Sequence, residues 1–326
     1  MLTRLFKSSL PFQAVILATI TGLLWLNVFY QPSKMPGFDS YVIQKGIYNA
    51  FATDATVSSV MALLALVLSA LIFNFFIANN DYIPRYTLLP AFLYVLFFIN
   101  PPGLLFLNTA TLPTVLLLVV LINTMKMHDK EDAFVLVFNT SFIAALAAIL
   151  YPPAMVYLVF IWFSFLVNGL HKWREWVISV LGFVIPYLFV LMAYFWFDRF
   201  PEFLVNHIPV PFIKWNAIPI PNTIEIILSV LISFLFIIGF RKVLTVQNER
   251  VISFRKRTWT MLWFSFFSFI SLLFAGAEYW YHLSLLTIPA IAFVSYYFLN
   301  QRKSLGAELM VWLLLIITVL QNTGVL

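Results

Sequence analysis

The chain contains no cysteine, so disulfide bonds, thiolate zinc sites, iron–sulfur ligation and cysteine nucleophiles are excluded. Charged residues are also scarce: they make up 10% of the 326 residues, whereas soluble domains carry roughly a quarter. The four histidines show neither H-x-x-x-H nor H-E-x-x-H spacing, so the sequence predicts no metal site. A phosphate-binding glycine loop, a G-x-S-x-G nucleophile and a dinucleotide fingerprint are absent as well, and we expect no cofactor.

The chain is instead rich in apolar residues. Hydrophobic residues make up 63% of the chain, aromatic residues 18%, and the mean hydropathy is +0.96. A water-soluble globule of this size could not bury so much apolar surface and keep a charged exterior. Lipid is therefore the expected solvent for most of the chain. This excludes soluble enzymes, secreted disulfide scaffolds and nucleic-acid readers, and it makes membrane lipids the first expected partners.

Apolar runs of about 17 to 25 residues predict membrane-spanning helices, because backbone in hydrocarbon must satisfy its own hydrogen bonds. Eleven runs are candidates, of which the third and the last are short: 12–30, 55–78, 86–99, 104–124, 133–150, 154–170, 177–196, 224–240, 258–274, 283–299 and 305–320. Proline-containing tips at 100–103 and 151–153 predict tight hairpin turns. If each pair of runs is instead one kinked helix, nine spans remain. We predict an all-α, polytopic transmembrane bundle that forms one domain over residues 1–326.

The positive charges predict how this bundle is oriented. With eleven spans, 15 of the 19 Lys and Arg residues fall on one side of the membrane and four on the other. Basic residues favour the cytoplasmic side, so we expect a cytoplasmic N-terminus and an external C-terminus. The first run ends without a small-x-small cleavage site and is predicted to be a retained helix. We expect a bacterial cytoplasmic (inner) membrane, external loops at 31–54 and 197–223, and a basic cytoplasmic loop at 241–257.

The first external loop carries two candidate catalytic acids. Apolar residues at helical spacing within 43–51 predict a short helix that lies in the membrane interface. Asp39 precedes this helix and Asp54 precedes the second span. Either carboxylate could act as a general base where a lipid-borne substrate reaches it. Both positions also suit helix N-caps, because Asp accepts amide hydrogen bonds there.

Two further external segments carry candidate binding residues. Arg199, His207 and Lys214 could hold the phosphate of a lipid carrier. Alternatively, that loop simply rests at the interface with its cations near lipid head groups. Glu278 and His282 lie four residues apart, a spacing that suits an acid–base pair or an ion pair at the surface.

The spans themselves contain few ionisable residues, which disfavours proton-coupled transport. Polar side chains such as Asn168 and Ser141 are expected to make hydrogen bonds between helices. Ala144 and Ala148 form a small face that predicts close helix packing. The basic residues of 241–257 are expected to orient the chain and to attract anionic lipids.

The order of these features resembles the GT-C superfamily of membrane glycosyltransferases, which draw sugars from polyprenyl-phosphate carriers. The matching features are a first span, an external loop with an interfacial helix and the acids Asp39 and Asp54, and hairpins with short tips. The turn at 171–176, followed by a helix with Gly182 and Pro186, is also similar to that group. The resemblance extends over about the first 200 residues, and the two acids lie fifteen positions apart where members carry an acidic pair.

The resemblance implies a glycosyltransferase that acts on a lipid-linked sugar at the external face. Asp39 or Asp54 would be the base, with Arg199, His207 or Lys214 near the phosphate of a polyprenyl-phosphate carrier. The chain is also similar to uncharacterised bacterial multi-pass inner-membrane families. Two alternatives therefore remain: a non-catalytic subunit or scaffold with membrane-protein partners, and a flippase or facilitator for a lipidic solute.

Overall fold

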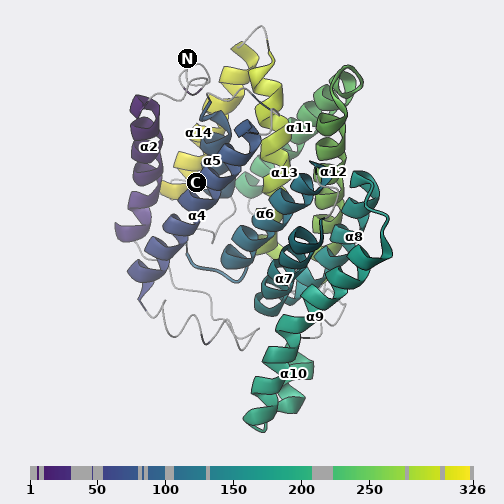
Figure 1. Cartoon of the computed structure of the whole chain (residues 1–326). Helices are drawn as coiled ribbons and strands as arrows, with labels where there is room; N and C mark the ends of the chain where they lie inside the picture. The colour runs from purple at the N-terminus through teal and green to yellow at the C-terminus, as the bar shows by residue number, and fades with distance from the viewer. Residues whose placement is uncertain are drawn as a thin grey trace.

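The computed structural model describes residues 6, 11–30, 46, 54–79, 83, 87–99, 106–129, 133–207, 223–275, 279–301 and 305–323. Every regular element in these ranges is a helix, and Figure 1 shows the helices packed together. The α-helices are α2 (Pro11–Tyr30), α4 (Ala55–Asn79), α5 (Leu89–Ile99), α6 (Thr111–Lys126), α7 (Phe134–Leu150), α8 (Tyr157–Asn168), α9 (Trp173–Trp196), α10 (Phe200–His207), α11 (Thr223–Val246), α12 (Ile252–Leu272), α13 (Tyr279–Leu299) and α14 (Leu305–Thr323). Three short 3-10 helices join them: η1 (Met127–Asp129), η2 (Pro152–Val156) and η4 (Gln247–Glu249).

Each predicted span overlaps one of these helices, and α10 is an additional short helix. Four helical stretches are long and apolar enough to cross a membrane: Thr56–Ala78, Trp173–Trp196, Ile226–Glu249 and His282–Leu299. The chain is therefore an all-helical protein with the features of an integral membrane protein. How many of the shorter helices also cross, and on which side each terminus lies, stays a prediction.

Helix α5 is too short to span a membrane by itself. It has 11 residues, which gives a length of about 16 Å, roughly half the hydrocarbon thickness. All of its side chains are buried, and it packs against α4 and α13. A helix that is apolar on every side belongs in the interior of a bundle. The run at 86–99 thus forms a core helix enclosed by its neighbours.

Helix α6 begins seven residues later than the apolar run predicted, because Asn108 holds the preceding backbone in a turn. Its side-chain Oδ1 accepts a hydrogen bond from the Ala110 amide at 3.0 Å. The Asn108 amide in turn donates to the Thr111 hydroxyl at 3.1 Å. Such local side-chain bonds compete with helix formation and favour turns. Residues 106–110 are buried without being helical.

The proline-containing tip after α7 separates two helices, as the sequence predicted. Helix α7 ends at Leu150, and Pro152 opens η2, where its missing amide hydrogen has no helical partner to lose. Helix α8 then runs antiparallel to α7. Its last residue, Asn168, shows this, because it donates a hydrogen bond to the Thr124 carbonyl at the end of α6, the helix that precedes α7. The other predicted tip, 100–103, lies outside the described residues.

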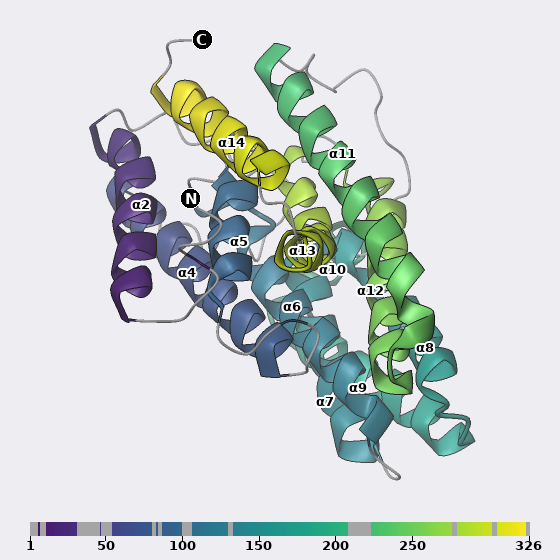
Figure 2. The same ribbon diagram turned by 90° about the horizontal axis from the view of Figure 1, so that it is seen from above.

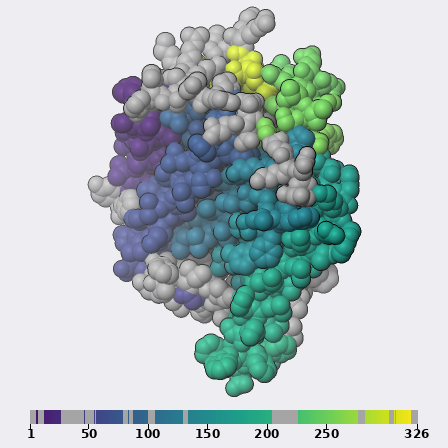
Figure 3. Space-filling view, in the orientation of Figure 1, coloured from purple at the N-terminus to yellow at the C-terminus, as the bar shows by residue number. Residues whose placement is uncertain are grey.

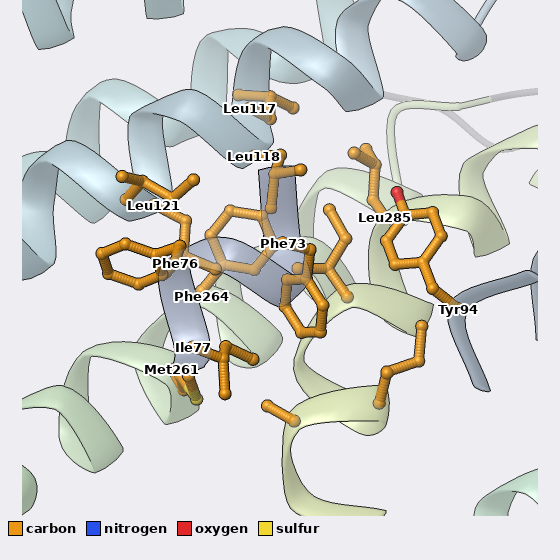
Figure 4. Packing of buried hydrophobic residues seen from close by; sticks show 14 of the residues in the cluster. Phe73, Phe76, Ile77, Tyr94, Leu117, Leu118, Leu121, Met261, Phe264 and Leu285 are labelled. Carbon is orange, nitrogen blue, oxygen red and sulfur yellow. The ribbon is translucent and has the colours of Figure 1, made fainter. Parts of the chain in front are cut away.

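The core is one cluster of apolar side chains from helices throughout the bundle. Figure 4 shows Phe73 of α4, Tyr94 of α5, Leu118 of α6, Phe264 of α12 and Leu285 of α13 packed together. Figure 2 shows α13 near the centre, with α5, α6, α11, α12 and α14 around it. Large aromatic and branched side chains fill the space between the helices, and dispersion contacts rather than expelled water hold such a core together in lipid.

Helices α7 and α9 run in the same direction and approach closely at Gly182. The Lys172 ammonium, just before α9, lies 5.9 Å from the centre of the Phe134 ring at the start of α7. Further along, a Cβ atom on Gly182 would lie 2.7 Å from the Phe138 carbonyl oxygen and 3.2 Å from the Ser141 Cβ. Ala144 and Ala148 are fully buried, in agreement with the predicted small face. Small residues allow this close contact between helices.

Replacing Gly182 by alanine is expected to destabilise the protein by about 1–3 kcal/mol, because the added methyl group meets backbone that cannot move aside cheaply. Gly22→Ala in α2 is the matched control, since a Cβ there meets nothing within 4 Å. The control is expected to be neutral or stabilising by about 0.5–1 kcal/mol, because alanine favours helix. Thermal unfolding in detergent measures both variants. Equal effects would contradict the close α7–α9 packing.

Candidate functional site

A cluster of buried polar side chains surrounds His282 and joins three helix ends. Tyr151 follows α7, Ser268 and Ser271 lie in the last turns of α12, and His282 lies in the first turn of α13. The Tyr151 hydroxyl lies 3.0 Å from His282 Nδ1. His282 Nε2 lies 2.9 Å from both the Ser268 carbonyl oxygen and the Ser271 hydroxyl. Tyr157 joins this His282 cluster through a 2.7 Å hydrogen bond to the Ser268 hydroxyl.

The hydrogen-bond pattern fixes where the imidazole proton lies. The Ser268 carbonyl can only accept, so His282 Nε2 carries a hydrogen and donates it. The Ser271 hydroxyl donates to the same carbonyl at 3.2 Å and therefore can accept from Nε2. In neutral imidazole, Nδ1 then accepts the Tyr151 hydroxyl hydrogen. Nε2 thus has no lone pair with which to take a proton from Ser271, and this geometry does not activate a serine nucleophile.

The prediction that His282 lies at the surface is wrong. Its side chain is completely buried, and both of its ring nitrogens are engaged by neighbouring helices. The apolar run placed His282 just before the start of a span, but most of the stretch of α13 from His282 to Leu299 is buried inside the bundle. Its role is to tie helix ends together.

Further hydrogen bonds place other helix ends beside the His282 cluster. The Thr114 hydroxyl in the first turn of α6 lies 2.9 Å from the Ser284 hydroxyl of α13. The Ser58 hydroxyl in the first turn of α4 accepts the Leu107 amide hydrogen at 3.1 Å. Because α9 runs parallel to α7, its last turn lies at this end too. We call this part of the bundle the Tyr151 end.

Asp54 and Arg199 both lie at the Tyr151 end. Asp54 is exposed and directly precedes α4, and its carbonyl accepts the Ser58 amide hydrogen at 3.0 Å, as at an N-cap. Arg199 follows α9, with 63% of its side chain exposed, and its Nε lies 3.9 Å from a carboxylate oxygen of Glu202. Figure 1 shows the start of α4 and helix α10 toward the same lower end of the molecule.

Arg199 sits on a projecting hairpin with an apolar surface. The end of α9 exposes Phe195 and Trp196, with 84% of the Trp196 side chain accessible. Asp198 turns the chain with a φ of 56°, a conformation that Asp tolerates better than most residues. Helix α10 then packs against α9. Figure 3 shows this hairpin projecting from the surface.

Several predicted site residues cannot be placed. Asp39, Lys214 and Glu278 lie outside the described residues, as does nearly all of the predicted interfacial helix at 43–51. His207 ends α10, but its side chain is not among those described. Of the predicted set, the structure thus brings Asp54 and Arg199 to one end of the bundle and moves His282 into the interior.

A second polar cluster, the Asn168 cluster, lies at the opposite end. Asn168 Nδ2 donates to the carbonyl oxygens of Thr124 and Ser164 at 3.1 and 2.8 Å. The Lys256 ammonium donates to the Asn168 carbonyl at 3.0 Å and to His128 Nδ1 at 3.1 Å. A cation beside the last carbonyls of α8 also complements the helix dipole. The expected interhelical role of Asn168 is confirmed, and we call this region the Asn168 end.

Glu175 is a buried ionisable residue that the sequence analysis missed. Helix α9 begins at Trp173, four residues before the predicted span, so Glu175 lies in its first turn. Its side chain is completely buried, and neither carboxylate oxygen has a hydrogen-bond partner. The Ser141 hydroxyl on α7 is likewise unpartnered, contrary to its expected interhelical hydrogen bond. The spacing of Glu175, Ser179, Gly182 and Pro186 along one helix face was the signal available in the sequence.

Within the part of the chain that the structure describes, no three His, Asp or Glu side chains form a group that could hold a metal ion. The two polar clusters consist mainly of hydroxyl, amide and imidazole groups that bind one another. Their arrangement is suited to holding helices in register at the two ends of the bundle.

Replacing Tyr151 by phenylalanine removes the hydrogen that satisfies His282 Nδ1 and is expected to cost about 1–3 kcal/mol of unfolding free energy. Tyr187→Phe is the matched control, because the Tyr187 hydroxyl has no hydrogen-bond partner. It is expected to be neutral or slightly stabilising. Thermal unfolding of both purified variants provides the comparison. A Tyr151 variant as stable as the control would contradict the assigned role of the cluster.

Replacing Glu175 by leucine is expected to stabilise the fold by about 1–3 kcal/mol, because it removes buried carboxylate oxygens without partners. Glu249→Leu serves as the control: Glu249 is exposed, so its loss should change stability by no more than about 0.5 kcal/mol. Melting temperatures in the same detergent report both changes. A large loss of stability in Glu175→Leu would mean that the carboxylate has a stabilising partner in the native protein.

Comparisons with known proteins identify a family but no activity. No curated protein and no solved structure matches the chain. One family model matches residues 39–323, which is well over half of the sequence. The chain therefore belongs to DUF6427, a family of unknown function.

Proposed function

We propose that the chain is a membrane-embedded glycosyltransferase that uses a lipid-linked sugar donor at the Tyr151 end of the bundle. One observation carries the proposal: an exposed carboxylate, Asp54, and an exposed guanidinium, Arg199, lie at the same end of the bundle, and the apolar tip of α9 lies at that end too. Transfer from a lipid-borne substrate requires a base for the acceptor, a cation that binds the phosphate, and an apolar surface along which the lipid chain reaches the site.

The two residues have different roles in the proposed reaction. Asp54 takes the proton from the acceptor hydroxyl, whose oxygen forms the new bond to the anomeric carbon of the sugar. The bond between that carbon and the phosphate oxygen of the polyprenyl carrier breaks, and the carrier leaves as its phosphate. Arg199 stabilises the charge on this leaving group, because a guanidinium matches phosphate geometry. Asp39, His207 and Lys214 remain additional candidates in the adjoining segments.

The orientation that this proposal needs is supported by the distribution of cations. The Asn168 end exposes Lys172, Arg174, Arg250 and Arg255. The positive-inside tendency therefore favours a cytoplasmic Asn168 end and an external Tyr151 end. We propose eleven crossings in a bacterial cytoplasmic membrane, with the N-terminus inside and the C-terminus outside. The shorter helices cross where neighbouring helices enclose them, as they do α5, or where the bilayer is locally thinned.

A second candidate is a non-catalytic subunit of an envelope assembly. The continuous core, which includes the fully buried helix α5, favours it, because a scaffold needs rigid packing faces and no access for a substrate. The two candidates differ in what the loss of Asp54 does. A scaffold tolerates a neutral residue at this exposed position, whereas the enzyme does not.

Asp54→Asn is expected to lower product formation at least 100-fold, as loss of a general base typically does, without changing protein abundance. Glu249→Gln, an exposed acid at the Asn168 end, is the control and should leave the product unchanged. Asp39→Asn is tested in parallel, so that the base can be assigned to one of the two acids. Mass spectrometry of lipid-linked sugars and envelope glycans, with immunoblots for abundance, gives both readouts.

Normal glycans in the Asp54→Asn/Asp39→Asn double variant, at normal protein abundance, would overturn the enzymatic proposal. Loss of an envelope complex in a deletion strain, restored by that same double variant, would identify the scaffold.

A further inference from the structure

The Asn168 end carries a surface of exposed cations that come from two turns of the chain. The first turn joins α8 to α9 and presents Lys172 and Arg174. The second joins α11 to α12 through η4 and presents Arg250 and Arg255. Among the described side chains of these two turns, Glu249 is an exposed acid. The described part of the two turns thus exposes more Lys and Arg than acid, and it is separate from the proposed Asp54 and Arg199 site at the other end.

Lys256 holds the two turns side by side. It belongs to the first turns of α12, yet its ammonium donates to the Asn168 carbonyl at the end of α8. It also lies 3.8 Å from where a Cβ on Gly169 would be. Gly169 has a φ of 82°, which lets the chain leave α8 and turn toward α9. The cations of the two turns thus flank a fixed junction, and we call the whole the double-turn surface.

Two arginines of this surface, one on each turn, have no partner of their own. Lys256 is engaged by Asn168 and His128, and Arg250 lies near the Tyr296 hydroxyl and the Phe254 ring. The side chains of Arg174 and Arg255, by contrast, make no hydrogen bond or ion pair within the part of the chain that the structure describes. Arg241 and Lys242, in the last two turns of α11, are exposed cations at the same end. A guanidinium can bind a phosphate through two parallel hydrogen bonds.

Exposed apolar side chains lie among these cations and indicate which kind of anion binds. Trp173 is 70% exposed, Val251 69% and Ile252 58%, and each is next to or near a cation in sequence. A nucleic acid or an acidic protein would leave these three side chains in water at the rim of its contact. At a membrane surface they enter the boundary between head groups and acyl chains, where tryptophan is enriched, while the neighbouring cations reach the phosphates.

We propose that the double-turn surface binds the phosphodiester head groups of anionic phospholipids, with Arg174 as the phosphate ligand on one turn and Arg255 on the other. Trp173, Val251 and Ile252 contact the upper acyl chains of the bound lipids. This binding fixes the depth of α9 and α12 in the membrane. It requires only that the chain is embedded in a bilayer, so it is independent of the proposed glycosyl transfer.

The test uses the purified full chain in detergent, with added phosphatidylglycerol as the anionic probe and phosphatidylcholine as the zwitterionic one. Phosphatidylglycerol is expected to raise the melting temperature by several degrees and to remain bound in native mass spectrometry. The Arg174→Gln/Arg255→Gln variant should lose at least half of that shift. Lys126→Gln, an exposed cation at the end of α6 outside both turns, should keep it.

Because Arg174 and Arg255 are exposed, the double variant should melt at the wild-type temperature without lipid, which separates lost binding from lost folding. Equal shifts with both lipids would overturn the proposal, as would a full shift in the double variant. Preferential stabilisation by a short single-stranded RNA over phosphatidylglycerol would identify a nucleic-acid surface instead. A double variant that melts lower without lipid, yet still responds fully to phosphatidylglycerol, would show that the arginines serve the fold and not the lipid.

Discussion

The hydrogen bonds of His282 are the interaction on which the arrangement of the bundle most depends. One imidazole joins the end of α7, the end of α12 and the start of α13. In an apolar medium each of these polar groups would be costly without a partner, so the cluster is stable only as a complete set. Lipid provides no hydrophobic force between helices, and such polar contacts, together with close packing, determine which helix ends meet.

The need to pair buried polar groups also explains the contacts at the Asn168 end. At the Asn168 end, Lys256 supplies a charge to the C-terminus of α8, and Asn168 binds the end of α6. Between the two polar clusters the described interior is mainly apolar, and buried hydroxyls there, such as those of Thr260 and Ser265, bond to the backbone of their own helix. Thr114 and Thr124 on α6 mark the two levels, which a helical rise places about 15 Å apart. Glu175 departs from this pattern, because its carboxylate is buried and unpartnered in the α7–α9 interface.

The sequence predicted where the helices lie because apolar runs and their proline-containing interruptions are local signals. The break at Tyr151 is one such case, and α9 ending at Trp196 is another. The start of α6 was missed for a local reason, because the side-chain bonds of Asn108 compete with the helix within an apolar run. Elsewhere the sequence failed where a distant partner decides the outcome: the burial of α5 depends on the helices that enclose it. Whether His282 faces lipid or protein likewise depends on Tyr151, which is 131 residues away in the chain.

For the candidate site, residue type indicated chemistry but could not indicate accessibility. A carboxylate before a helix fits both a cap and a base, and the structure leaves Asp54 in a position that suits both. Arg199 remained an exposed cation because it follows the turn at Asp198, where the chain leaves the packed helices. Glu175 was missed because the predicted span began at residue 177, which left Glu175 in the turn at 171–176 instead of in the first turn of α9.

The account rests on the Tyr151 end being external and the Asn168 end being cytoplasmic. Because the chain has no native cysteine, single cysteines can report this directly when placed at the exposed positions Glu202 and Glu249. A membrane-impermeant maleimide applied to intact spheroplasts is predicted to label Glu202→Cys, and to label Glu249→Cys only after the membrane is opened. Labelling of Glu249→Cys in intact spheroplasts, with Glu202→Cys protected, would contradict the account.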